Sequence, residues 1–197
     1  MMDAALQHIL TGCKNNERTA QKALYGRYCN LFMMMCLRYV NTEADAEEIL
    51  NNAFLRIYKH INKYSGQGSL EGWMKKIVAN CCLTYIAKPG YKVLSKIIPI
   101  QSGNSYHQPN CLKEIAVDNT AVEDRHHKDH LLTLLKNLPG TTRLVFNLYV
   151  FEEYNHSEIG ALLGMAERTS QGHLATARKI LRNEFDKEKL MAKILRV

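Results

Sequence analysis

The sequence predicts an all-α protein made of two small helical domains joined by a long irregular linker. Apolar residues recur at spacings of three and four over most of the chain, whereas the strict alternation typical of strands is scarce. Glycine and proline gather in a few places, most densely near the middle of the chain. We therefore expect domains over residues 1–88 and 124–197, with the linker over residues 89–123.

The composition favours packed cores and an anionic partner. The chain has 197 residues, 46% of them hydrophobic, and a formal net charge of +7. Lysine and arginine outnumber acidic residues 11 to 7 over residues 1–88 and 11 to 8 over residues 128–197, whereas residues 89–127 carry 4 of each. Because the positive charge lies in the two predicted domains, each is a candidate for contact with nucleic acid or another anionic surface.

Metal, cofactor and catalytic sites are not expected. None of the six cysteines forms a C-x-x-C pair, so we predict free, mostly buried thiols in a reducing cytoplasm. His126, His127 and His130 could place two imidazoles on one helical face, but no third and fourth ligands lie nearby. No nucleophile–base pair and no phosphate-binding loop occurs in the sequence, which predicts a protein without enzymatic activity.

A cytoplasmic location without membrane insertion is expected. The first ten residues lack a basic region and contain Asp3, unlike a signal peptide. The apolar run Leu31–Leu37 is too short to span a bilayer and ends at Arg38.

Two helices are expected before residue 41. The first covers about Ala4–Leu10 and stops at Gly12, a residue suited to a left-handed cap. The second runs from about Glu17 to Val40, and its apolar face consists of Leu24, Tyr28, Leu31, Phe32, Met35 and Tyr39.

Two more helices complete the first domain. Thr42 and Asp45 resemble a capping box, and further acidic residues crowd the first turns, where the helix dipole favours them. This third helix ends near His60, and we expect it to bury Ile49, Ala53, Phe54 and Ile57. The fourth helix is expected over Glu71–Ala87, with an apolar stripe made of Trp73, Ile77, Cys81 and Tyr85.

Trp73 is the only tryptophan, and its neighbours favour a role in nucleic-acid binding. Lys75 and Lys76 follow it, and a polar loop with two glycines, Asn62–Glu71, precedes it. An aromatic ring beside paired ammonium groups suits a nucleobase drawn out of its stack. The alternative is a core tryptophan on an amphipathic helix whose lysines are solvated.

The predicted linker contains an apolar segment as well as turn-forming residues. Pro99, Gly103 and Pro109 oppose regular structure. We expect the apolar residues to dock on another surface: Val93, Leu94, Ile97, Ile98 and Ile100.

The second domain has the pattern of a helix-turn-helix. One helix from about Asp124 presents Leu131, Leu134, Leu135 and Leu138, and the next presents Leu144, Val145, Leu148 and Val150. A short helix over Ser157–Leu163, a turn at Gly164 and a last helix from Glu167 to about Phe185 follow. In a helix-turn-helix the start of this last helix enters the major groove. An ordinary helical hairpin with a glycine turn is the alternative.

Both halves together resemble bacterial RNA polymerase sigma factors of the extracytoplasmic-function (ECF) group. Leu24–Tyr28 is similar to the family's LYxRY segment, Asp45–Leu50 to DAEDI, Gly68–Met74 to GSFRGWL and Ile77–Asn80 to IARN. In the second half, the similar segments are Leu138–Pro139, Tyr154–Gly164 and Arg168–Lys179, which match the LP, the first helix and the recognition helix of the family's C-terminal domain.

The resemblance implies a sigma factor that binds core RNA polymerase, recognises the minus-ten and minus-thirty-five promoter elements and directs transcription initiation. The implied contacts with the beta-prime coiled coil of the polymerase are Asp45, Glu47, Glu48 and Asn52. The implied minus-ten contacts are Asn62, Lys63, Tyr64, Ser65, Gly66, Gln67, Trp73, Lys75, Lys76 and Asn80. The implied minus-thirty-five contacts are Arg168, Thr169, Ser170, Gln171, Gly172, His173, Ala175, Thr176, Arg178 and Lys179. The beta flap of the polymerase and a separate anti-sigma factor are further implied partners.

Some positions depart from the family pattern, and two other functions remain open. Asn51–Asn52 stands where the family has glutamine followed by an acidic residue, and Ser170–His173 replaces the frequent VKSR. A helix-turn-helix regulator that dimerises on a palindrome would explain the second half but not the first. An all-helical adaptor without a DNA role is the remaining alternative.

Overall fold

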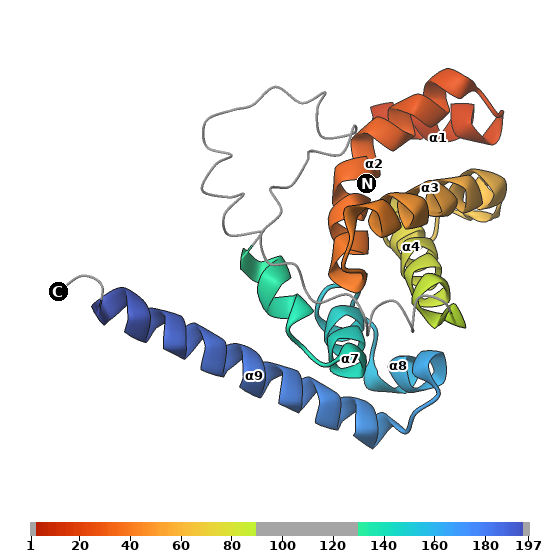
Figure 1. Ribbon diagram of the computed structural model, residues 1–197. Coiled ribbons are helices and arrows are strands. Elements are labelled where there is room, and N and C mark those ends of the chain that lie inside the picture. Colours follow the sequence, from red (N-terminus) through yellow and green to blue (C-terminus); the bar gives the residue numbers. More distant parts are fainter. Residues whose placement is uncertain (1–2, 90–129, 195–197) are drawn as a thin grey trace. The chain divides into compact units, whose positions relative to one another are not determined.

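The computed structural model describes residues 3–89 and 130–194, which form two compact units (Figure 1). Helices make up most of both ranges, and neither range contains a strand, so the all-α prediction is confirmed. The division between the units falls within residues 90–129, outside the described residues. The linker's apolar residues, Cys111, His126 and His127 also lie there, and the domain boundaries drawn from the sequence stay a prediction.

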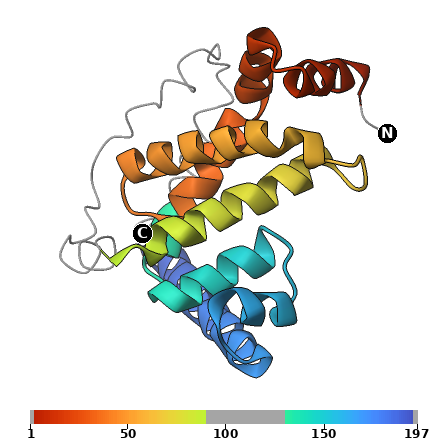
Figure 2. The same ribbon diagram turned by 90° about the vertical axis from the view of Figure 1, so that its right-hand side faces the viewer.

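Residues 3–89 of the first unit form four α-helices and one turn of 3-10 helix. In chain order they are α1 (Ala4–Lys14), α2 (Arg18–Tyr39), α3 (Glu43–His60), η1 (Ile61–Lys63) and α4 (Leu70–Ala87). The long helix α2 packs against α1, α3 and α4, and α3 and α4 lie side by side (Figure 2).

The core of the first unit is aromatic where α2 meets α3. Phe32 is fully buried, and its ring centre lies 5.8 Å from that of Phe54, which in turn lies 4.6 Å from the ring of Tyr25. Burial of one such side chain contributes about 1.5–3 kcal/mol to stability. The predicted stripe of α3 is confirmed, because Ile49, Ala53, Phe54 and Ile57 are all buried.

The end of the first helix differs from the prediction. α1 continues through Gly12 to Lys14, and the left-handed residue after it is Asn16, with φ of 60°. A Cβ at Gly12 would lie 2.5 Å from the Cβ of Ala20. This glycine therefore serves the close approach of α1 and α2 and not a helix cap.

The apolar faces of α2 and α4 also differ in part. Leu31 is 40% exposed, although the spacing placed it on the buried face of α2. In α4 Trp73, Ile77 and Tyr85 are only partly buried, and of the predicted stripe Cys81 alone lies in the core. The buried residues of α4 are Leu70, Met74, Val78, Ala79, Cys81 and Cys82. The buried face is centred on the neighbouring stripe, because α4 packs against both α2 and α3.

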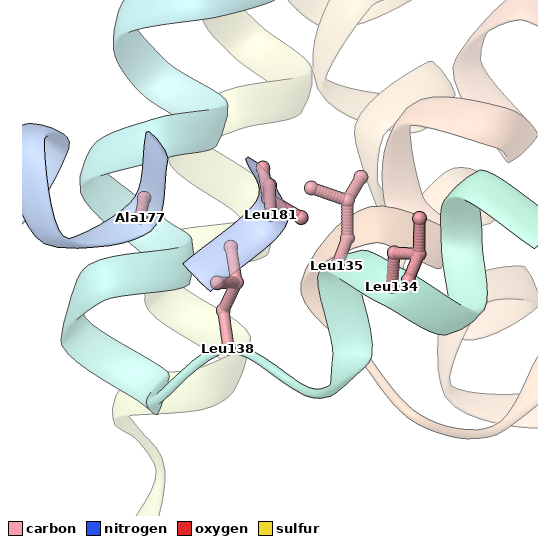
Figure 3. Packing of buried hydrophobic residues seen from close by; sticks show 5 residues of the cluster. All are labelled: Leu134, Leu135, Leu138, Ala177 and Leu181. Atoms are coloured by element: carbon pink, nitrogen blue, oxygen red, sulfur yellow. The ribbon is translucent and has the colours of Figure 1, made fainter. Parts of the chain in front are cut away.

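The second unit holds a helix over residues 130–136, then α7 (Gly140–Val150), α8 (His156–Leu163) and α9 (Glu167–Ile194). Its core joins the first of these helices to α9 through Leu134, Leu135, Leu138, Ala177 and Leu181 (Figure 3). Leu131 and Val150 were predicted to be apolar contacts but are 37% and 42% exposed, and Leu132 is buried instead. The last helix runs to Ile194, so the charged segment after Phe185 continues it.

Two further expectations concern the state of the cysteines and the lack of a membrane-spanning helix. Cys13, Cys29, Cys36, Cys81 and Cys82 are buried thiols that form no disulfide, as predicted for them. None of the helices in residues 3–89 and 130–194 combines the length and apolarity required to cross a bilayer. His130 contacts the ring of Phe185 edge-on at 6.3 Å between ring centres.

Candidate functional sites

The segment between α3 and α4 folds around the side chain of Tyr64. The Tyr64 hydroxyl donates to the backbone oxygen of Gly68 at 2.8 Å, and Lys14 Nζ donates to the backbone oxygen of Tyr64 at 3.4 Å. Gly66 and Gly68 adopt φ of 84° and 75°, which favours glycine. These contacts fix both sides of a short turn whose tip, Ser65–Gln67, is exposed.

Tyr64 and Trp73 are structural parts of this segment. Tyr64 is only 4% exposed, so its ring is not available to stack on a base, contrary to its assignment as a minus-ten contact. Trp73 is partly buried, and its ring centre lies 5.7 Å from that of Tyr64. The two aromatic rings pack on each other and support the exposed turn from beneath.

Most residues of the predicted minus-ten set are exposed polar side chains. Lys75 is ion-paired with Glu71 at 2.8 Å, one helical turn away, whereas Lys76 is exposed. The start of α4 is capped by Ser69, whose Oγ accepts from the backbone nitrogen of Gly72 at 3.0 Å. The exposed members of the predicted minus-ten set are Asn62, Lys63, Ser65, Gly66, Gln67, Lys76 and Asn80.

The acidic start of α3 divides into exposed and inward-facing side chains. Glu47, Glu48 and Asn52 are exposed, whereas Asp45 is partly buried. The carboxylate of Asp45 accepts from Thr42 Oγ1 at 2.6 Å, and Thr42 Oγ1 accepts from the backbone nitrogen of Asp45 at 3.1 Å. Thr42 is thus the N-cap of α3, as predicted, and the expected partner Asp45 accepts from its hydroxyl.

A network of four side chains, here called the carboxylate network, links α3 to the end of α4. It consists of Asp45, Glu48, Tyr85 and Lys88. The Tyr85 hydroxyl lies 2.6 Å from Oδ1 of Asp45 and 3.2 Å from Oε2 of Glu48, and Lys88 Nζ lies 3.1 Å from Oε1 of Glu48. Burial raises the pKa of the Tyr85 phenol and the hydrogen bond to Asp45 raises it further, so the phenol keeps its proton and donates it.

The second unit has the geometry of a helix-turn-helix. Asn155 and Glu158 form a reciprocal capping box at the start of α8, with backbone contacts of 2.8 and 2.9 Å. Gly164 ends α8 in the left-handed conformation, with φ of 67°, and α9 begins at Glu167. A Cβ at Gly160 would lie 2.6 Å from the backbone oxygen of Met165, so α8 and the turn approach closely only because residue 160 is glycine.

The first three turns of α9 present most of the predicted reading residues to solvent. These exposed residues are Arg168, Thr169, Gln171, Gly172, Ala175, Thr176, Arg178 and Lys179. Ser170 is an exception, because it is fully buried and its hydroxyl lies 2.9 Å from Nδ1 of His156. Its assignment as a base contact is wrong for a physical reason: Ser170 shares the inward face of α9 with Leu174, Ala177 and Leu181.

Three residues that the sequence analysis did not single out, Thr142, Tyr149 and His156, hold α9 in place. Thr142 of α7 is buried, and its Oγ1 lies 3.1 Å from Nδ1 of His173, which is partly buried. The ring of His156 stacks on Tyr149 with centres 4.5 Å apart, and the Arg178 guanidinium lies 5.9 Å from the same tyrosine ring. These contacts join α9 to α7 and α8 beneath its exposed face.

Comparison with known proteins assigns each unit to a part of one protein family. Residues 24–90 match the model of sigma-70 region 2, and residues 128–181 match that of sigma-70 region 4. The chain is 19% identical to the ECF RNA polymerase sigma-E factor of Escherichia coli K12, over 90% of this chain and 93% of that protein. It is 21% identical to the ECF RNA polymerase sigma factor SigW of Bacillus subtilis, over 93% and 98% of the two chains.

A solved structure has the same fold. The structure of CnrH in complex with the cytosolic domain of CnrY matches 91% of this chain and 96% of the CnrH chain, with a TM-score of 0.51 and 14% sequence identity. The likeness extends over both helical units and supports the all-α architecture.

Proposed function

The chain belongs to the ECF group of bacterial RNA polymerase sigma factors, and from this premise we propose which of its residues carry each part of promoter recognition. It recognises promoter DNA, binds core RNA polymerase and directs transcription initiation. The observation that carries the assignment is the presence of regions 2 and 4 in order in one chain. A dimeric regulator would need only the second of them.

The turn between α3 and α4 captures bases of the melted minus-ten element in this proposal. Its support is the combination of an exposed polar tip with a buried aromatic base, since Tyr64 and Trp73 hold the turn while Ser65, Gly66 and Gln67 remain accessible. Asn62 and Lys63 precede the tip in the chain, and Lys75, Lys76 and Asn80 follow it on α4. All five would contact the strand, the lysines through its phosphates.

The exposed side of α9 reads the minus-thirty-five duplex. Arg168, Thr169 and Gln171 lie in its first turn and a half, where helix-turn-helix proteins contact base edges. A glutamine amide can bond an adenine at two atoms, and an arginine can do the same with guanine. Gly172, Ala175 and Thr176 border the groove, while Arg178 and Lys179 suit phosphates.

The acidic start of α3 binds the polymerase. Glu47, Glu48 and Asn52 face solvent together, and exposed carboxylates attract a cationic surface. We assign this face to the beta-prime coiled coil and the second unit to the beta flap, on the strength of family membership. RNA synthesis belongs to the polymerase, and we propose that this chain has no enzymatic activity of its own and acts in the cytoplasm.

We also propose a separate anti-sigma factor as a regulator. The support is that CnrH, which shares this fold, is in complex with the cytosolic domain of CnrY.

Reconstitution with purified core polymerase tests the proposed function. The chain should direct run-off transcription from defined start sites, and it should bind promoter DNA poorly in a gel-shift assay without polymerase. Tight binding of an isolated dimer to a palindrome, with no stimulation of transcription, would favour the regulator.

Reversal of charge at the exposed carboxylates tests the polymerase face. Glu47→Lys combined with Glu48→Lys should weaken binding to core polymerase at least tenfold and leave the helical content unchanged, because both side chains are exposed. Unchanged affinity would remove this face from the interface.

A further inference from the structure

The end of α4 makes contacts that none of the roles above explains. Tyr85 and Lys88 lie about 40 residues from Asp45 and Glu48 in the chain, yet the four side chains form the carboxylate network. One of them, Glu48, belongs to the acidic face that we assign to the polymerase, and Asp45 lies on the turn of α3 just before it. Lys88 also stands 4.3 Å from the centre of the Tyr85 ring, so each member touches at least one other.

The two carboxylates receive different partners. A phenol has one proton, and the shorter contact of 2.6 Å directs it to Asp45. Asp45 also accepts from Thr42, so hydrogen bonds hold both of its oxygens. Glu48 lies 3.2 Å from the phenol oxygen, and its positive partner is Lys88 at 3.1 Å. Asp45 is therefore held at both oxygens by hydrogen bonds within the protein, whereas Glu48 is held by an exchangeable cation.

The exposure of the Glu48–Lys88 pair makes this exchange feasible. The side chains are 50% and 54% exposed, and an ion pair in that position adds little to stability. A lysine or arginine on a partner can take the place of Lys88 without leaving a buried charge behind. A cation of the partner cannot replace the hydrogen-bond donors of Asp45 as easily, because Asp45 is partly buried.

A pocket continues the surface from α3 onto α4. It is half-open, has a volume of about 170 Å³ and lies between the two helices. Asn52, one of the proposed polymerase contacts, shares its lining with Tyr85 and Lys88. The end of α4 thus borders the polymerase-facing side of α3 over a continuous surface.

We propose that Tyr85 is a positioning residue for polymerase binding and that Lys88 is an internal counter-ion which a cationic side chain of the polymerase displaces. The hydrogen bond from Tyr85 fixes the Asp45 carboxylate and, through it, the packing of α4 on the first turns of α3. This packing orients Glu48 and Asn52 toward the polymerase. Lys88 neutralises Glu48 until the partner binds. This inference rests on the assignment of the acidic face of α3 to the polymerase.

Three single substitutions in the full chain test it, with affinity for core polymerase measured at low and high salt. Tyr85→Phe keeps the ring and removes only the hydroxyl, and it should weaken binding about fivefold. Lys88→Met keeps an aliphatic stem, and it should tighten binding about twofold to fivefold at low salt and have no effect at high salt. Tyr58→Phe is the matched control, because the Tyr58 hydroxyl donates to the backbone of Gln21 on another side of α3, and it should not change the affinity.

The outcomes separate this inference from the proposed polymerase face. If Glu47→Lys with Glu48→Lys abolishes binding while Tyr85→Phe behaves like Tyr58→Phe, the positioning role is wrong and the polymerase face stands. If the charge reversal has no effect, the polymerase face and the inference both fail. If the Tyr85→Phe variant has a lower melting temperature, the Lys88→Met variant tests the inference instead. Unchanged or weaker binding of Lys88→Met to core polymerase at low salt would overturn the counter-ion role.

Discussion

Ser170 and Gln171 are neighbours in the recognition helix, but their environments are opposite. Ser170 is buried against His156, whereas Gln171 is exposed and its amide lies 3.4 Å from the carboxylate of Glu167. A helix turns by about 100° per residue, so adjacent positions can serve the core and the groove. Under the proposed role of α9, the pair therefore separates the stability of the second unit from its choice of DNA sequence.

Substitution of each residue by alanine should give complementary results. Gln171→Ala should change the preference at one base pair of the minus-thirty-five element by about 1–3 kcal/mol, because a bidentate contact is lost, and should leave the melting temperature unchanged. Ser170→Ala should destabilise the second unit by about 1 kcal/mol through the lost hydrogen bond and keep the sequence preference. Promoter selection and thermal melting measure the two effects. A changed preference in Ser170→Ala would contradict the inward placement of this residue.

The hydroxyl of Tyr64 gives a second test at this scale. Tyr64→Phe removes the bond to the backbone of Gly68 and keeps the ring against Trp73. We expect slower opening of the promoter, by a few fold, because the base-capturing turn is less well ordered before it binds. Affinity for core polymerase should not change. The opening rate can be followed with a fluorescent base in the minus-ten element, and a rate equal to that of the unmodified chain would show that the turn does not depend on this bond.

At the scale of helices, the pattern of the sequence predicted which segments are helical better than which faces are buried. The third helix and the helix-turn-helix were predicted correctly, since strong caps and a glycine turn mark their ends. In α4 two adjacent stripes are both apolar at a spacing of four, and only contact with α2 and α3 decides which one is buried.

Some polar contacts could likewise be predicted from the sequence, and others could not. The inward position of Ser170 could have been found, because it lies four residues before Leu174 on the same stripe. The bond from Tyr85 to Asp45 joins residues 40 positions apart, and no local pattern indicates it. Contacts of this kind depend on how whole helices pack.

The close approach of α8 to the turn that follows it leads to a testable prediction about helix packing. Gly160→Ala should destabilise the second unit by about 1–3 kcal/mol, because the added Cβ meets the backbone of Met165, which cannot move aside easily. Gly172→Ala is the control, since a Cβ there meets nothing within 4 Å, and it should stabilise α9 by about 0.5–1 kcal/mol. Thermal melting of the two variants compares them. Equal melting temperatures would show that the close approach at Gly160 is not required.

At the scale of the whole chain, two DNA-binding surfaces of modest charge act as parts of one factor. Each unit alone offers few cations, so its DNA affinity should be low and should fall with salt. Two sites in one chain bind a common target far more tightly than either alone when a scaffold sets their separation. In the proposed function core polymerase supplies that scaffold, and we therefore expect the chain to need polymerase to find a promoter.

The most direct test of this account is transcription by reconstituted polymerase from a library of random promoters. We predict that the active promoters share two separate sequence blocks, near minus ten and minus thirty-five, and that Gln171→Ala changes the upstream block alone. Active promoters with a single palindromic block, or with no shared upstream block at all, would contradict the assignment of two DNA-reading units to this chain.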